Sequence, residues 1–344
     1  PIPVSSSCAL RRPEGAFRMS FLEPAKPIFV DTVLDDPSIV PELVARGGRY
    51  PTVQRYLRNL TEMAALSDAG RRAPDERSAK MPIAPWFRGD LAIDRPLVPG
   101  VEAFFANERL SDAARALFGA DDVEPFQVYL NLNTPMPRVD PGHVDVPSFR
   151  GFDRSTEPVW LLVTMLKSGL FERWYVPTAT AVAWYYRGEG GGFRFWPGGP
   201  DAPSQVLPCR SNTAIVGDND RMFHAVHRVG AKDAKTLWGL GMDASIALED
   251  GRYVVRDGEE IRATYDYDEV RLSISWKARV FRTPRERELF DSGEDRLDLE
   301  TVTRVFVDHL RARGIEHAPP DDLRTDERFM KVLNDAFHIA PRAA

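Results

Sequence analysis

One of the chain's six histidines stands beside a carboxylate in a stretch of extended character. The sequence "RVDPGHVDVPSFRGF" at 138–152 places His143 two residues before Asp145. Residues two apart on a β-strand project from the same face, so both side chains can reach one ion. Iron(II) is held well by two imidazoles and one carboxylate, which leave its other positions open. A structural hydrogen bond between the two side chains is the alternative.

A second imidazole has to arrive from another part of the fold. The stretch "DNDRMFHAVHRVG" at 218–230 offers His224 and His227. The other histidines, His309, His317 and His338, lie in a region of helical pattern, where surface or capping roles suffice. The histidines of the strand-rich region therefore favour a metal site of two histidines and one carboxylate.

The composition is that of an ordinary globular protein. The chain has 344 residues, of which 43% are hydrophobic and 28% charged. Its net charge of −6 provides no long-range attraction for phosphate backbones or anionic lipids. No run approaches the roughly 18–20 apolar residues that cross a bilayer. We therefore expect neither a nucleic acid nor a membrane as partner.

Cysteine usage and the N-terminus both favour the cytoplasm. The two cysteines, Cys8 and Cys209, lie far apart in sequence, and a disulfide framework is not expected. The opening "PIPVSSSCALRRPEGAF" lacks the apolar run of a secretory signal. Pro1 as first residue is consistent with removal of an initiator methionine.

The segment "FQVYLNLN" at 126–133 alternates apolar and polar residues with a period of two, as a strand does. Its apolar face contains Phe126, Val128, Leu130 and Leu132, and its polar face contains Gln127, Tyr129, Asn131 and Asn133. The polar face either borders solvent or lines a polar cavity. In a cavity, Tyr129 and Asn131 are candidates for binding a ligand.

Strand patterns recur after this segment, separated by glycine-rich turns. They occur at 178–187, 191–197, 211–218, 223–229, 235–242, 251–257, 259–267 and 270–281. Helical patterns flank them at 36–69 and 111–119, where Ser111 is the expected N-cap and Gly119 the C-cap, and again at 158–174, 298–314 and 325–338. This layout predicts a mainly β fold with flanking helices, built on a double-stranded β-helix (jelly roll, cupin-like) core.

We divide the chain into three regions on this pattern. Residues 1–120 form an irregular and helical region that packs on the core. Residues 121–283 form the jelly-roll core, with a hairpin insertion near 245–268. Residues 284–344 form a C-terminal helical region. The terminal additions are expected to shape the pocket entrance or to form a homodimer contact.

The order of these motifs resembles the iron(II)/2-oxoglutarate-dependent dioxygenase superfamily. The resemblance covers about residues 126–281 and rests on "HVD", "GGGFRFWPGG", "NTAIVGDNDRMFHAV" and a later arginine on a strand. It implies a catalytic metal triad of His143, Asp145 and His224, with Fe(II), 2-oxoglutarate and O2 as cofactors. His224 begins "HAVHRV", which is similar to the family's run after the distal histidine, and is preferred to His227. Related halogenases replace the acid, so Asp145 disfavours halogenation.

The resemblance also implies a basic residue that binds the far carboxylate of 2-oxoglutarate, and two candidates remain open. Lys235 follows His224 by 11 residues, close to the family's usual separation. Arg271 and Ser273 in "VRLSISW" resemble the family's Arg-x-Ser pair and share one strand face. We favour Arg271 with Ser273, because guanidinium binds carboxylate in bidentate fashion, although a solvated strand face also fits. Arg150 is a further candidate, for an acidic group of the substrate.

The resemblance implies an oxidoreductase that hydroxylates, desaturates or cyclises its substrate at an unactivated C–H bond. The size of the chain and the lack of nucleic-acid features favour a small-molecule, biosynthetic substrate, with a peptide or protein as the alternative. Two alternatives stay open. One is an iron oxygenase of the same fold that does not use 2-oxoglutarate. The other is a non-catalytic cupin-like binding protein whose histidines are merely buried.

Overall fold

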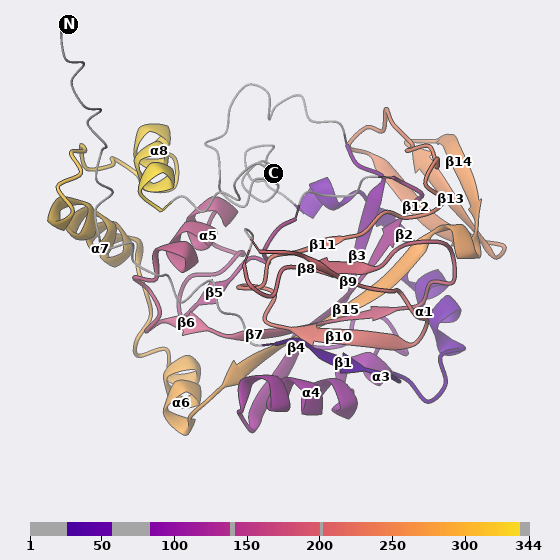
Figure 1. The fold of residues 1–344 in the computed structure, drawn as a ribbon, viewed down its shortest axis with the longest axis horizontal. Helices are drawn as coiled ribbons and strands as arrows, with labels where there is room; N and C mark the ends of the chain where they lie inside the picture. Colours follow the sequence, from indigo (N-terminus) through magenta and orange to yellow (C-terminus); the bar gives the residue numbers. More distant parts are fainter. Residues whose placement is uncertain (1–25, 57–82, 138–141, 200–201, 338–344) are drawn as a thin grey trace, which may run out of the picture.

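Six antiparallel strands form the main sheet of the molecule (Figure 1). The computed structural model describes residues 26–56, 83–137, 142–199 and 202–337. In sheet order the strands are β1 (Ile28–Val30), β10 (Thr213–Gly217), β7 (Thr178–Trp184), β15 (Arg271–Phe281), β4 (Asp122–Asn133) and β3 (Trp86–Ile93).

A smaller antiparallel sheet faces the main one across a cavity. It consists of β11 (His224–Val226), β8 (Phe193–Phe195) and β9 (Gln205–Leu207), and His143 pairs with the outer edge of β11. Along the chain the strands visit the two sheets in turn: β4 main, His143 small, β7 main, β8 and β9 small, β10 main, β11 small, β15 main. This alternation is that of a double-sheet jelly roll. The predicted fold class is therefore confirmed.

Strand β4 has the two chemically different faces that its alternation predicts. Val128, Leu130 and Leu132 are buried in the core that includes α3 (Glu102–Phe105) and α4 (Glu108–Phe118). Tyr129 and Asn131 line the cavity instead. Because β15 and β3 pair with β4 on either side, it is not an edge strand, and its polar residues face a cavity rather than bulk solvent.

One residue of β4 departs from the predicted alternation. Gln127 pairs with Lys277 and Pro125 with Ala278, which leaves Phe126 opposite no residue of β15. This irregularity shifts the register by one residue, so Phe126 lines the cavity together with Gln127. The prediction that Phe126 shares the apolar face is wrong for this reason.

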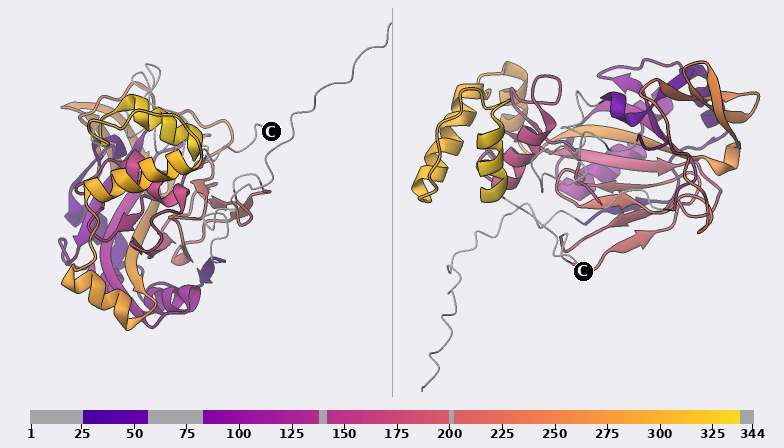
Figure 2. Two further views of the ribbon diagram at one scale, coloured as in Figure 1. Left: turned by 90° about the vertical axis from the view of Figure 1, so that its left-hand side faces the viewer. Right: turned by 90° about the horizontal axis from the view of Figure 1, so that it is seen from above.

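A third sheet and most remaining helices lie at opposite ends of the jelly roll (Figures 1 and 2). The third sheet contains, in order, β14 (Glu260–Asp266), β13 (Arg252–Asp257), β12 (Ala244–Glu249) and β2 (Arg49–Pro51). A separate two-stranded sheet consists of β5 (Ser148–Phe149) and β6 (Tyr175–Val176). The helices are α1 (Ile39–Gly47), α5 (Val159–Ser168), α6 (Pro284–Ser292), α7 (Leu299–Ala312) and α8 (Glu327–Ala336), with short 3-10 turns η2 (Val53–Tyr56) and η4 (Tyr267–Glu269). Residues of α5, α7 and α8 share one apolar core. No described helix is long and apolar enough to span a membrane.

Strands β1, β2 and β3 were not predicted, because their region was assigned to helices and irregular chain. β1 and β3 belong to the main sheet, and β2 belongs to the third sheet. The division at 120/121 and 283/284 therefore stays a proposal. The expected strand at 235–242 is absent apart from a bridge at Leu240, because Gly239 adopts a φ of 75° and Trp238 is exposed. Predictions for Cys8, His338 and the helical pattern at 57–69 lie outside the described residues.

Helix α4 begins earlier than the sequence suggested. Its N-cap is Asn107, whose Oδ1 accepts a hydrogen bond from the backbone N of Leu110 at 3.1 Å. Ser111 lies inside the helix and donates to the Asn107 carbonyl oxygen, so its expected capping role is wrong. Gly119 ends the helix in the left-handed conformation, as expected.

Asn107→Ala should lower the free energy of unfolding by about 1–2 kcal/mol, because the cap bond is lost and the Val33 carbonyl loses a buried donor. Ser111→Ala is the matched control. It should change stability by less than about 0.5 kcal/mol, because the gain in helix propensity offsets the lost back-bond. Urea unfolding of both variants measures the difference, and equal losses would restore Ser111 as the cap.

Candidate metal centre

The backbone pairs His143 and His224 directly across two neighbouring strands. The N–H of each donates to the carbonyl oxygen of the other, at 2.8 and 2.9 Å. Directly opposed residues of an antiparallel pair extend their side chains to the same face. The ring centroids accordingly lie 4.4 Å apart. Asp145, two residues beyond His143, projects to that face as well.

These three side chains form a compact set of metal-ligand atoms. One nitrogen each of His143 and His224 and one oxygen of Asp145 all lie within 4.8 Å of one another. His224 Nε2 is 3.7 Å from Asp145 Oδ1. The structure therefore brings the three predicted ligands together. Two imidazoles and one carboxylate converging from one side are the donor set that suits iron(II) with open positions.

The protonation of His224 is set by a neighbouring carbonyl. Its Nδ1 lies 2.9 Å from the Met222 carbonyl oxygen. A carbonyl only accepts, so Nδ1 carries the proton and Nε2 is the ligand atom, directed toward Asp145. His227 does not line the cavity among the described residues. Its backbone N donates to Gly192, and its pKa is lowered by burial and by Arg194 and Arg228.

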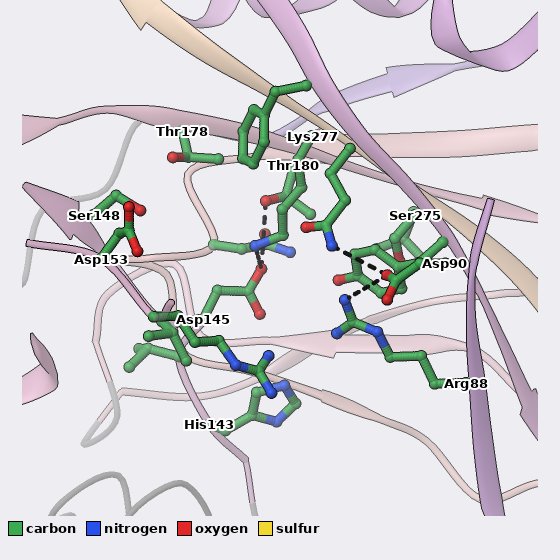
Figure 3. Close-up of a pocket in the computed structure, with 18 of the residues that line it drawn as sticks. Arg88, Asp90, His143, Asp145, Ser148, Asp153, Thr178, Thr180, Ser275 and Lys277 are labelled. Atoms are coloured by element: carbon green, nitrogen blue, oxygen red, sulfur yellow. Dashed lines mark hydrogen bonds and ion pairs between the residues drawn. The ribbon is translucent and has the colours of Figure 1, made fainter. Parts of the chain in front are cut away.

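The second oxygen of Asp145 is held by the main sheet. Lys277 Nζ lies 2.8 Å from Asp145 Oδ2, and Thr180 Oγ1 donates to the same oxygen at 3.3 Å (Figure 3). Burial raises the pKa of Asp145, but the charges of Lys277 and of the two histidines outweigh it, and the net pKa lies well below the usual range. Burial lowers the pKa of Lys277, and the Asp145 charge raises it above its ordinary value. Both groups are therefore ionised at neutral pH.

Arg271 adds a buried positive charge to the lining of the cavity. Its side chain is 1% exposed, and it donates to three uncharged oxygens: those of Gly191, Asn133 and Ser273. Among the described residues, none accepts a hydrogen bond from its Nη2. Burial lowers the pKa of this guanidinium, since the charge is held without a carboxylate partner. An anionic ligand would satisfy both the charge and the orphaned N–H group.

Of the other four co-substrate candidates, three line this cavity and one does not. Ser273, Tyr129 and Asn131 line it, whereas Lys235 is exposed and lies outside it. Asn131 is held on both sides, because its Oδ1 accepts from Trp86 and its Nδ2 donates to Ser275. Of the two basic candidates, Arg271 lines the cavity and Lys235 does not, and the residue that binds 2-oxoglutarate stays a prediction.

The cavity continues from the metal ligands toward solvent and has a volume of about 1030 Å³. Figure 3 shows Arg88 and Asp90 on one side of Asp145, and Ser148 and Asp153 on the other. Asp90 Oδ1 accepts from Arg88 and from Gln127, both at 3.1 Å, and the Arg88 guanidinium lies 3.6 Å from the centroid of the Tyr129 ring. This outer part therefore offers both donors and acceptors.

Arg150, the candidate for an acidic substrate group, is already engaged. It lines the cavity, but its Nη2 donates to Asp295 Oδ2 at 2.9 Å and to the Arg173 carbonyl at 2.7 Å. These bonds link the residue after β5 to the segment that precedes α7, through Asp295, and to the segment that precedes β6, through Arg173. Its direct role in binding substrate stays a prediction.

The chain is similar to solved structures of iron(II) and 2-oxoglutarate oxygenases. A Pseudomonas putida prolyl-4-hydroxylase is 14% identical, with 71% of this chain and 98% of that chain covered at a TM-score of 0.28. The non-heme monooxygenase ThoJ, as a nickel complex, is 11% identical, with coverages of 86% and 95% and a TM-score of 0.35. HygX from Streptomyces hygroscopicus, with nickel, 2-oxoglutarate and hygromycin B bound, is 12% identical, with coverages of 71% and 87% and a TM-score of 0.31.

No protein-family model matches the sequence, and no curated protein matches it. At such low identities and TM-scores, function has to be inferred from this chain's own side chains. What those side chains add to the resemblance is a donor set of two histidines and one aspartate, with a buried arginine in the same cavity.

Sequence reasoning missed Lys277 and Thr180, which hold Asp145, and Arg88 and Asp90 in the outer cavity. A signal for Lys277 was present, since it lies six residues after Arg271 on one strand and therefore on the same face. Arg88 could not be found, because its strand β3 was not predicted.

Proposed function

We propose that the chain is an iron(II)- and 2-oxoglutarate-dependent oxygenase that hydroxylates, or otherwise oxidises, an unactivated C–H bond of a small molecule. For hydroxylation the balance is R–H, O2 and 2-oxoglutarate giving R–OH, succinate and CO2. The observation that carries the proposal is the shared cavity: three convergent metal ligands and one buried, unneutralised arginine line the same space.

His143, Asp145 and His224 would hold the metal. Bound iron(II) supplies the chemistry that couples reduction of dioxygen and decarboxylation of 2-oxoglutarate to oxidation of the substrate. Arg271 would bind the far carboxylate of 2-oxoglutarate, with the Ser273 hydroxyl orienting the guanidinium at 2.9 Å. Tyr129 and Asn131 would form the wall beside it.

A small molecule fits the cavity as substrate. Its volume of about 1030 Å³ is at the upper end of the roughly 300–1,000 Å³ typical of small-molecule sites. The mixed wall of Arg88, Asp90, Ser148 and Asp153 suits a polar substrate with several hydrogen-bonding groups. A biosynthetic role, the cytoplasm as location and a homodimer remain proposals from the sequence.

The test is succinate release and oxygen uptake by the purified protein with iron(II), 2-oxoglutarate and a panel of polar compounds. We expect succinate release that requires both iron and 2-oxoglutarate. Oxygen uptake without 2-oxoglutarate would favour an oxygenase that does not use it. Failure to bind iron, together with no oxygen uptake, would favour a non-catalytic binding protein.

A further inference from the structure

Lys277 occupies a central place opposite the metal ligands. On β15 it pairs with Thr180 of β7 on one side and with Gln127 of β4 on the other. Its side chain is 12% exposed, and it faces the cavity together with Arg271, Ser273 and Ser275. Unlike Arg271, which has uncharged partners, Lys277 is paired directly with a carboxylate, Asp145.

The two oxygens of Asp145 are in different surroundings. Oδ1 lies on the histidine side, 3.7 Å from His224 Nε2. Oδ2 accepts from both Lys277 and Thr180, at 2.8 and 3.3 Å. A charge-assisted hydrogen bond to an ammonium is among the stronger ones, and it holds an oxygen in place. Because Lys277 and Thr180 are paired neighbours in the sheet, their positions are fixed by the backbone.

We propose that Lys277 is a positioning residue that restricts Asp145 to a single metal-binding oxygen, Oδ1. This inference rests on the proposed function, since it concerns the same metal. Two histidines and one carboxylate oxygen use three positions of a six-coordinate iron, which leaves three. A chelating 2-oxo acid takes two of these and dioxygen needs the third. If Oδ2 also bound the metal, the position for dioxygen would be lost.

Three variants separate this role from others. Lys277→Met keeps the length of the side chain but removes the donor. Lys277→Gln keeps a donor without the charge. Arg279→Met is the matched control. Arg279 lies two residues further along β15 and also lines the cavity, but it pairs with Asp94 and not with Asp145.

The readout is anaerobic binding to the iron-loaded full-length protein, with nitric oxide as the probe for the dioxygen position. The visible charge-transfer band that 2-oxoglutarate forms with iron(II) reports co-substrate binding independently. In Lys277→Met we expect this band to form, while nitric oxide affinity in the presence of 2-oxoglutarate falls by about tenfold or more, the effect typical of residues that orient metal ligands. Lys277→Gln should retain most of the wild-type nitric oxide affinity, and Arg279→Met should retain all of it.

Unchanged nitric oxide affinity in Lys277→Met would overturn the proposal. A loss of 2-oxoglutarate affinity alone would also overturn it, and would make Lys277 a co-substrate ligand. Equal losses of nitric oxide affinity in the methionine and glutamine variants would likewise overturn it, because they would show that Lys277 acts through its charge and not through the hydrogen bond that positions Oδ2. Absence of the band in the wild-type protein would instead contradict the proposed function itself.

Discussion

Replacing His224 with alanine should lower succinate release by more than about a hundredfold, since even the loss of a residue that merely orients a metal ligand costs about 10–100-fold. His224 is buried, and a carbonyl fixes its proton on Nδ1 so that Nε2 points toward Asp145. Removing the ring leaves two ligands on one short segment. Iron binding, measured by calorimetry with manganese(II) as a stable substitute, should weaken in parallel.

His227→Ala is the matched control, three residues along the same segment. His227 lines no part of the cavity among the described residues, and burial together with the nearby arginines lowers its pKa, which favours the uncharged imidazole at neutral pH. Its replacement should change activity by less than about twofold, as for a substitution away from the site. Comparable losses in both variants, or full metal binding by His224→Ala, would show that the metal site is assigned wrongly. Asp145→Ala should also abolish succinate formation.

Arg271→Met should weaken 2-oxoglutarate binding by about a hundredfold or more, because breaking a buried ion pair costs about 3–5 kcal/mol and each 1.4 kcal/mol is tenfold. The loss should be confined to the co-substrate. Metal affinity should stay within about twofold of wild type, since the hydrogen bonds of Arg271 go to Gly191, Asn133 and Ser273, none of which is a proposed metal ligand. Calorimetric titration of the metal-free protein with manganese(II) measures the metal affinity, and titration of the manganese-loaded protein with 2-oxoglutarate measures the co-substrate affinity.

Arg271→Met also has an expected effect on stability that guards against misfolding as an explanation. Among the described residues, no group accepts a hydrogen bond from Arg271 Nη2, but Nε and Nη1 donate to Gly191, Asn133 and Ser273. Methionine would remove the unpaired buried charge, which favours folding, and also these hydrogen bonds, which disfavours it. The free energy of unfolding of the ligand-free variant should therefore change by less than about 2 kcal/mol.

Lys235→Met is the control for charge, because Lys235 is the exposed basic residue that sequence spacing offered as the alternative. Its replacement should leave 2-oxoglutarate affinity unchanged. A loss in Lys235→Met and not in Arg271→Met would reverse the assignment. Wild-type 2-oxoglutarate affinity in both variants would show that other residues bind the co-substrate.

The sequence by itself predicted those features that depend on local geometry. The period of two in "FQVYLNLN" put Tyr129 and Asn131 on one face, and it failed only at Phe126, where an irregular pairing with β15 shifts the register. The spacing of His143 and Asp145 likewise predicted a shared direction, because alternate residues of an extended chain project together. Most strands of the jelly roll followed from alternation and turn residues, but β1, β2, β3, β5, β6 and β9 were not predicted, and the strand expected at 235–242 is absent apart from a bridge at Leu240.

Only the tertiary structure determined which side chains from distant parts of the chain lie together. Strand pairing places His224 directly opposite His143, and it brings Lys277 and Thr180 from the main sheet onto Asp145. The same pairing turns Arg271 inward and leaves Lys235 in solvent. These contacts join residues 35 to 132 positions apart. Register between distant strands is set by the whole core and its turns, which no local pattern specifies.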